Sequence, residues 1–309
     1  MKTAFLFSGQ GSQYSGMGRE LLEAVPQKGK EILDAAKSTF DFDLWKIMQE
    51  GSPEELSQTR VSQPAIFTVS LLALAAASER GIGFEGVAGH SLGEYAAMVA
   101  AGVLTLEEGY IAIKYRAIAM DKAAKANPGA MAAVIGLPAE KVVEVCEKVK
   151  SEGDYVSAVN FNSPVQTVIA GTKEGIEKAS AAAKEAGARR AMPLAVSAAF
   201  HSDLMKSAAE EFKEAVKDTD FKPAKIKFYS NVIGAELTDF SDMQSLMAKH
   251  ICSPVKFTDE LNAMKNDGFD CYIELGPGKV LTGLVGKTLK DVKAVNIENA
   301  ETLAAALAE

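Results

Sequence analysis

The stretch Gly86-Val87-Ala88-Gly89-His90-Ser91-Leu92-Gly93 decides the fold. A short apolar run, typical of a buried strand, ends at His90-Ser91, and a helical pattern follows over Leu92–Ala101 until Gly102. The segment Gly89–Gly93 fits G-x-S-x-G, the nucleophile elbow. Its glycines allow a tight strand-to-helix turn that lifts the serine hydroxyl clear of the backbone, and the helix N-terminus offers N–H groups to a developing oxyanion. We therefore expect an α/β protein with a nucleophilic Ser91, the alternative being an ordinary glycine-rich turn.

The composition excludes several classes of protein. The chain has 309 residues, 48% hydrophobic and 24% charged, with a formal net charge of -8. This charge argues against binding to nucleic acid or to an anionic membrane surface. Cys146, Cys252 and Cys271 lack CxxC spacing, so the sequence suggests neither a disulfide framework nor a zinc site. We expect no metal.

Two features bear on location. The N-terminal stretch MKTAFLFSGQGSQ has one lysine and an apolar run of only four residues, too short for a signal peptide. The longest apolar stretch, Ala65–Ala77, is interrupted by Thr68 and Ser70. Since a membrane span needs about 20 residues, we expect a buried helix and a cytoplasmic protein with no membrane partner.

Strands and helices alternate on both sides of the elbow. Ser62-Gln63-Pro64 is a plausible helix start with proline in the first turn, and Thr105 with Glu108 forms a capping-box pattern before a helix to about Lys125. A further helix is predicted over Asp203–Lys217. The predicted strands are Thr3–Phe7, Lys225–Asn231, Asp270–Leu275 and Val292–Ile297. The alternation predicts an α/β-hydrolase-like core with a mostly parallel sheet.

A second unit interrupts this core. The composition changes at Asn127-Pro128-Gly129, and the next 70 or so residues read strand, helix, strand, strand, helix, strand. The predicted segments are the strands Ala130–Ile135, Tyr155–Phe161, Gln166–Ala170 and Arg189–Val196, a helix opened by Pro138, a turn at Asn162-Ser163-Pro164, and a helix capped by Thr172 and stopped by Gly187. This is the ferredoxin-like order. We therefore expect a subdomain at 127–197 inserted into a discontinuous catalytic domain, 1–126 and 198–309.

A serine nucleophile needs a base, and the chain has three histidines. His201 lies in a loop between a predicted strand and a predicted helix, where catalytic side chains are common. His90 precedes Ser91 and should leave the elbow in another direction, to be packed or hydrogen-bonded beneath the turn. His250 lies in a helical pattern and is expected at the surface or as a helix cap. His201 is thus the predicted base, a solvated loop histidine being the alternative.

The third member of a triad is harder to find. No acidic residue between Ser91 and His201 sits convincingly at a strand end, so a main-chain carbonyl could orient His201 in a Ser–His dyad.

Arg116 has only apolar neighbours three and four positions away in its helix. A guanidinium on such a face either snorkels to water or meets an anion, because an unpaired buried charge is costly. For the anion, an internal salt bridge and a substrate carboxylate are equal possibilities.

These residues together resemble the malonyl-CoA:acyl carrier protein transacylases of bacterial fatty acid synthesis and the related acyltransferase domains of polyketide synthases. The resemblance covers essentially the whole chain. Its markers are Phe7-Ser8-Gly9-Gln10-Gly11-Ser12-Gln13, Gly89-His90-Ser91-Leu92-Gly93-Glu94, Arg116, Ala199-Phe200-His201-Ser202 and Glu274-Leu275-Gly276-Pro277-Gly278.

The resemblance implies a role for each catalytic residue. Ser91 would attack the malonyl thioester and His201 would move its proton. The backbone N–H groups of Gln10 and Leu92 would form the oxyanion hole, and Arg116 would bind the free malonyl carboxylate. The implied reaction is a ping-pong transfer from malonyl-CoA through malonyl-Ser91 to the phosphopantetheine thiol of acyl carrier protein, with no cofactor.

Four further residues take supporting roles in the same resemblance. Phe200 looks like the malonyl-selective form, a small residue there tending to accompany methylmalonyl. His250 stands where many relatives carry glutamine, whose main-chain carbonyl orients the catalytic histidine. Asn160 and Asn162 would support the site without touching the substrate.

The sequence leaves two alternative functions and the position of the carrier-docking surface undecided. The first rival is a serine hydrolase or thioesterase that uses the same Ser–His pair, and the second is a non-catalytic carrier-binding domain. Carrier protein is acidic in this family, so docking needs a local basic patch. The candidates are Lys279, Lys287 and Lys290, for which a solvated helix face is the alternative.

Overall fold

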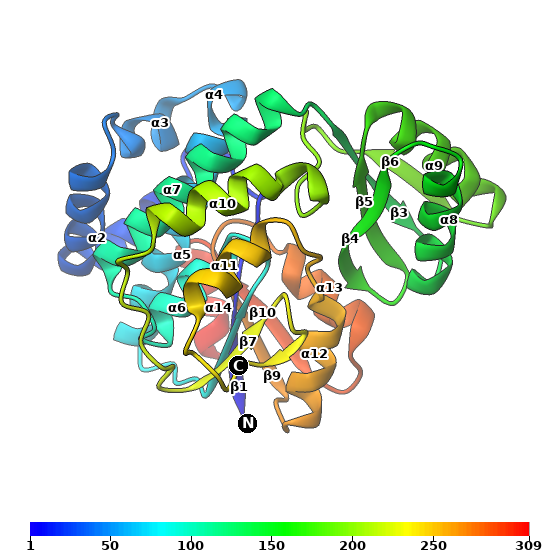
Figure 1. Cartoon of the computed structure of the whole chain (residues 1–309). Helices are drawn as coiled ribbons and strands as arrows, with labels where there is room; N and C mark the ends of the chain where they lie inside the picture. The colour runs from blue at the N-terminus through cyan, green and yellow to red at the C-terminus, as the bar shows by residue number, and fades with distance from the viewer. Residues whose placement is uncertain (309) are drawn as a thin grey trace.

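The structure is a computed structural model that describes residues 1–308, and its strands form two separate sheets (Figure 1). The larger sheet has the order β10-β9-β1-β2-β7-β8, and every neighbouring pair is parallel except β7 with β8. Its strands are β1 (Thr3–Phe7), β2 (Gly86–Gly89), β7 (Lys227–Ser230), β8 (Ala235–Glu236), β9 (Cys271–Leu275) and β10 (Lys293–Ile297). The strand of the elbow, β2, therefore lies between β1 and β7.

The smaller sheet is antiparallel, with the order β4-β5-β3-β6. Figure 1 shows it in green at one side of the molecule, with α8 and α9 packed beside it. Its elements are β3 (Ala130–Ile135), α8 (Ala139–Ser151), β4 (Val156–Ser163), β5 (Gln166–Gly171), α9 (Lys173–Glu185) and β6 (Arg190–Pro193). It has a hydrophobic cluster of its own, in which Val134, Val142 and Ile176 are buried.

Helices cover both faces of the parallel sheet. The helices outside the smaller sheet's unit are α1 (Arg19–Ala24), α2 (Pro26–Thr39), α3 (Leu44–Glu50), α4 (Pro53–Ser57), α5 (Thr59–Glu79), α6 (Gly93–Ala100), α7 (Leu106–Ala126), α10 (Lys206–Ala215), α11 (Met243–Ile251), α12 (Phe257–Asn266), α13 (Val280–Thr288) and α14 (Ala300–Ala308), with a 3-10 turn at Asp203–Met205 before α10.

Alternation along β1 separates two cores. Phe5 and Phe7 belong to the large cluster formed with α5, α6, α7 and α10. Ala4 and Leu6 point to the opposite face, where α12 and α13 pack. Successive side chains of a strand point to opposite faces of a sheet, so β1 is apolar throughout and buried on both sides, as central parallel strands are.

Most predicted elements are confirmed. β1 and the elbow strand β2 have the predicted bounds, and the Thr105–Glu108 capping box is formed at the start of α7. Ala65–Ala77 lies in α5, as expected of a buried helix. Among the described residues, α5 is also the one helix long and apolar enough to span a membrane, but 83% of its apolar window is buried inside the protein. It is a core helix.

Some predicted boundaries are wrong. α5 begins at Thr59, because the Val61 and Ser62 N–H groups already bond to the Gln58 carbonyl, so Pro64 lies inside the helix and not in its first turn. β6 ends at Pro193, which has no N–H to continue the ladder and is tolerated because β6 is an edge strand. β4 continues through Ser163, so the turn falls later than predicted.

Candidate active site

The elbow places Ser91 between the end of β2 and the start of α6. Ser91 has φ 55°, a left-handed conformation that few residues other than glycine adopt. A Cβ at Gly93 would overlap the Phe7 carbonyl, and one at Gly89 would overlap the backbone of Gly93. Both glycines are therefore required by the close approach of the chain segments that form the turn.

His201 contacts Ser91 from a loop 110 residues further along the chain. Its Nε2 lies 2.7 Å from Ser91 Oγ, and its Nδ1 lies 3.0 Å from the main-chain carbonyl of His250. A carbonyl only accepts, so the ring hydrogen is assigned to Nδ1 and the lone pair of Nε2 faces the hydroxyl. This is the geometry of a nucleophile and its base, oriented by a carbonyl and not by an acid.

The surroundings keep the His201 ring neutral. Burial, and then the positive charge of Arg116, lower the pKa of His201 to about 3. The imidazole is therefore unprotonated near neutral pH and can accept a proton from Ser91.

Arg116 is completely buried and reaches the same hydroxyl from α7. Its Nη2 lies 3.0 Å from Ser91 Oγ, and its Nη1 donates to Gln63 Oε1 at 2.7 Å. Its Nε has no hydrogen-bond partner. Within residues 1–308 Arg116 forms no ion pair with a carboxylate, so the internal salt bridge is not found and the charge faces the nucleophile.

A cavity of about 360 Å³ opens over Ser91. Both polar and apolar side chains line it; the lining residues are Gln10, Gly11, Gln13, Ser57, His90, Ser91, Met120, Met131, Asn160, Leu194, Ala195, Val196, Phe200 and His201. In the described part of the chain, no acceptor is found for the N–H group of Gln10 or Leu92. Both donors are available to an oxyanion formed at Ser91.

The other predicted residues lie around this cavity. Phe200 and Asn160 line it, and the Oδ1 of Asn160 has no hydrogen-bond partner. Asn162 Oδ1 accepts a hydrogen bond at 2.7 Å from Nε2 of His90, whose ring packs edge-on against Phe257 beneath the turn.

The surface position predicted for His250 is wrong. Its side chain is completely buried, because the C-terminal end of α11 packs directly behind the elbow. Its main-chain carbonyl contacts His201, and its ring contacts Asn231.

Three polar residues of the site were missed in the sequence. Gln63 lies in the predicted helix start, and nothing in that local pattern indicates its bond to Arg116. Glu94 lies in the motif around the elbow and Asn231 at the end of a predicted strand, with no local pattern that indicates a role in the site. The available signal for Asn231 was its position directly after a strand parallel to β2, where side chains of adjacent strands meet.

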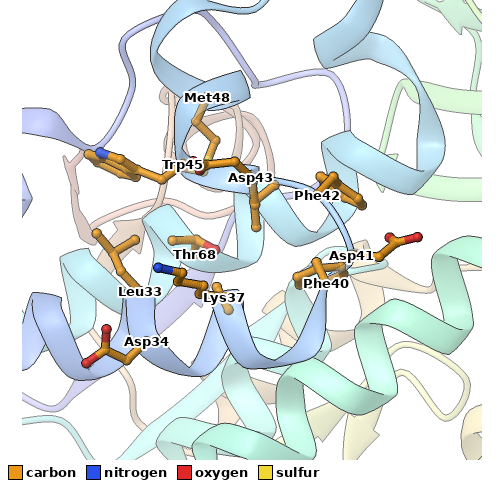
Figure 2. Close-up of a pocket in the computed structure, with 12 residues that line it drawn as sticks. Leu33, Asp34, Lys37, Phe40, Asp41, Phe42, Asp43, Trp45, Met48 and Thr68 are labelled. Atoms are coloured by element: carbon orange, nitrogen blue, oxygen red, sulfur yellow. The ribbon is translucent and has the colours of Figure 1, made fainter.

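A second hollow, of about 380 Å³, lies between α2 and α3 and is lined by Phe40, Phe42 and Trp45 among others (Figure 2). Figure 2 shows Asp34, Asp41 and Lys37 at its edge. None of the predicted site residues lines it.

The comparisons with known proteins decide the family. The model of the acyl transferase domain matches residues 4–306. The chain belongs to the acyl transferase domain family.

Curated members of the family are similar over their full length. A malonyl CoA-acyl carrier protein transacylase of Bacillus subtilis is 44% identical, covering 99% of this chain and 96% of that protein. One of Haemophilus influenzae is 39% identical, covering 96% of each.

Solved structures of the family agree in fold. The transacylase of Clostridium perfringens is 33% identical with a TM-score of 0.94, covering 100% of this chain and 96% of that one. A malonyl-transacylase solved in complex with a type II PKS acyl-carrier protein is 35% identical, also with a TM-score of 0.94, covering 100% and 99%.

Proposed function

We propose that this chain is a malonyl CoA-acyl carrier protein transacylase that carries the malonyl group on Ser91. The proposal rests on two groups that contact the same hydroxyl. His201 Nε2 lies 2.7 Å from Ser91 Oγ, and Arg116 Nη2 lies 3.0 Å from it. The first supplies a base and the second a cation for an acyl group that ends in a carboxylate.

The first half-reaction forms an ester. Ser91 Oγ bonds to the thioester carbonyl carbon while its proton moves to His201 Nε2, and the N–H groups of Gln10 and Leu92 stabilise the oxyanion. The C–S bond then breaks, and the imidazolium returns the proton to the departing thiolate of coenzyme A. In the second half-reaction the carrier's phosphopantetheine thiol attacks malonyl-Ser91 by the same steps in reverse.

The structure supplies a reason for selectivity. Nη1 of Arg116 is occupied by Gln63, while Nε is free and Nη2 faces Ser91. We assign Nε and Nη2 as the fork that binds the malonyl carboxylate. Phe200 lines the cavity and is assigned to selection of malonyl over methylmalonyl, with Asn160 and Asn162 as supports.

We also propose a division of the chain into two domains. We assign residues 1–126 and 198–309 to an α/β-hydrolase-like catalytic domain and 127–197 to a ferredoxin-like subdomain. The antiparallel sheet supports the second assignment, since its order β6-β3-β5-β4 corresponds to 4-1-3-2 within the unit.

The carrier-docking surface and the location are also proposed. Lys279, Lys287 and Lys290 are exposed at and after α13, and Lys287 Nζ reaches Gln166 Oε1 at 3.2 Å. Lys287 thereby lies where α13 meets β5, between the two sheets. We assign this surface to the acidic carrier protein, and the enzyme to the cytoplasm.

A donor comparison tests the function. The protein is mixed with malonyl-, methylmalonyl- or acetyl-CoA, and the intact mass is recorded before and after addition of holo-acyl carrier protein. We expect stoichiometric malonylation that is absent in Ser91→Ala and is discharged by the carrier thiol. Discharge to water at the same rate without carrier would identify a hydrolase instead, and no mass increase would identify a non-catalytic domain.

A further inference from the structure

Asn231 holds the chain on both sides of the nucleophile. It follows directly after β7, beside β2, and its side chain is completely buried. Its Nδ2 donates to the Gly89 carbonyl at 2.7 Å, and its Oδ1 accepts from the Ser91 N–H at 2.8 Å. The left-handed conformation of a residue such as Ser91 is strained and persists only where the surroundings enforce it. These two bonds enforce it.

His250 joins this amide to the other half of the dyad. Its main-chain carbonyl accepts from His201 Nδ1 at 3.0 Å. Its ring Nε2 lies 3.1 Å from Asn231 Oδ1 and 3.1 Å from Glu94 Oε2. The amide oxygen of Asn231 only accepts, which assigns the ring hydrogen of His250 to Nε2. His250 therefore supplies the carbonyl that orients the base and, through its ring, contacts the amide that holds the backbone of Ser91.

Two buried carboxyl groups complete the cluster. Glu260 Oε1 accepts from Asn231 Nδ2 at 2.8 Å, and Glu94 Oε1 accepts from the Asn231 backbone N–H at 3.0 Å. Burial raises the pKa of Glu94 to about 8 and raises the pKa of Glu260 well above its ordinary value. Both donors and both lone pairs of the Asn231 amide are thus engaged, which fixes its orientation.

We propose that Asn231 is a positioning residue for acyl transfer, and that the His250 side chain, acting through Asn231, ties the Ser91 backbone to the His201 ring. The inference rests on the proposed Ser91–His201 dyad. Neither the Asn231 nor the His250 side chain touches the reacting atoms, so both act by positioning the dyad. Asn231 also engages the Ser91 N–H, which leaves the oxyanion to the N–H groups of Gln10 and Leu92.

Asn231→Leu tests the amide, since leucine has a similar size and makes none of the four bonds. The readouts are the rate constant for labelling of Ser91 by a small fluorophosphonate, the single-turnover rate of acylation by malonyl-CoA, and the KM for malonyl-CoA. We expect both rate constants to fall about 10²-fold, the scale of a misplacement of about 1 Å, while the KM is unchanged.

Two variants at His250 distinguish the role of its ring from the role of its main-chain carbonyl. His250→Gln keeps the carbonyl and an amide donor for Asn231, whereas His250→Leu keeps only the carbonyl. We expect His250→Gln to stay close to the wild-type labelling rate and His250→Leu to fall about tenfold, which corresponds to one lost hydrogen bond.

Thr68→Val is the matched control. Thr68 is completely buried, and its hydroxyl bonds the Pro64 carbonyl and the Tyr110 hydroxyl, both at 2.8 Å, without contact with the dyad. It should lower the melting temperature and leave the labelling rate unchanged.

The outcomes are separable. The inference is overturned if folded Asn231→Leu labels at the wild-type rate, if His250→Gln and His250→Leu label equally fast, or if Thr68→Val slows labelling as much as they do. If Asn231→Leu does not fold, the His250 pair decides alone. If the wild type reacts with the fluorophosphonate but not with malonyl-CoA, the proposed substrate fails while the labelling rates still decide the positioning role. If neither reagent labels Ser91, the dyad fails and the inference fails with it.

Discussion

Replacing Arg116 with alanine should abolish the preference for a malonyl group. The guanidinium is completely buried, and Gln63 occupies Nη1, so Nε and Nη2 remain for the carboxylate. Each hydrogen bond to a charged group contributes about 1.5–3 kcal/mol. Two such bonds give about 3–6 kcal/mol, which lowers kcat/KM for malonyl-CoA about 10²–10⁴-fold in Arg116→Ala.

Acetyl transfer should change far less in the same variant. Acetyl has no carboxylate, so the loss is limited to the bond from Nη2 to Ser91 Oγ. An opposing effect comes from the charge itself. Arg116 lowers the pKa of His201, and its removal makes the imidazole a stronger base for either acyl group. We expect acetyl transfer to fall by less than about tenfold.

The assay measures kcat/KM for malonyl- and acetyl-CoA with holo-acyl carrier protein as acceptor. Arg116→Met, which fills more of the space without a charge, separates the loss of the cation from the cavity that alanine leaves. Lys122→Ala is the control on the same helix, since that lysine is exposed and pairs with Glu211; transfer from neither donor should be affected. Equal losses for malonyl and acetyl in Arg116→Ala and Arg116→Met would refute the assignment of Arg116 to the substrate carboxylate.

Three further predictions concern stability and docking. Gly93→Ala should lower the unfolding free energy by about 1–3 kcal/mol or more, because its Cβ would overlap the Phe7 carbonyl; a denaturation midpoint equal to that of the wild type contradicts this. The His201 side chain should oppose folding as the pH falls from 7 to 5, since its pKa is about 3 when folded against 6.5 when unfolded, so only the unfolded chain binds this proton in this range; the raised pKa of Glu94 acts in the opposite direction. The contribution of His201 at pH 5 is about 2 kcal/mol, so the change in unfolding free energy from pH 7 to pH 5, measured by urea denaturation, should be more favourable in His201→Gln than in the wild type by about this amount; an identical change in the two proteins contradicts the prediction. Reversing the charge of the three exposed lysines of the proposed docking surface should raise the KM for carrier protein about tenfold or more with the KM for malonyl-CoA unchanged, and an unchanged carrier KM disposes of that surface.

The local elements could be predicted because their signals are local. β1, β2 and the Thr105 capping box depend on residues within one strand or one helical turn, and their predicted positions are confirmed. Predictions failed where tertiary packing outweighs propensity. Pro64 lies within α5 because that helix is buried along most of its length, and the helix that carries His250 packs behind the elbow and not at the surface.

The sequence by itself determined the strained turn at Ser91, since Gly89 and Gly93 permit a bend that other residues would block. Only the tertiary structure decided which groups surround the hydroxyl. His201 is 110 residues away in sequence, Arg116 is 25 away, and the N–H of Ser91 is held by Asn231 from 140 residues downstream. The physical reason is that a turn is fixed by steric limits on neighbouring residues, whereas these hydrogen bonds exist only after parallel strands align their carboxyl ends and bury polar groups that must then be paired.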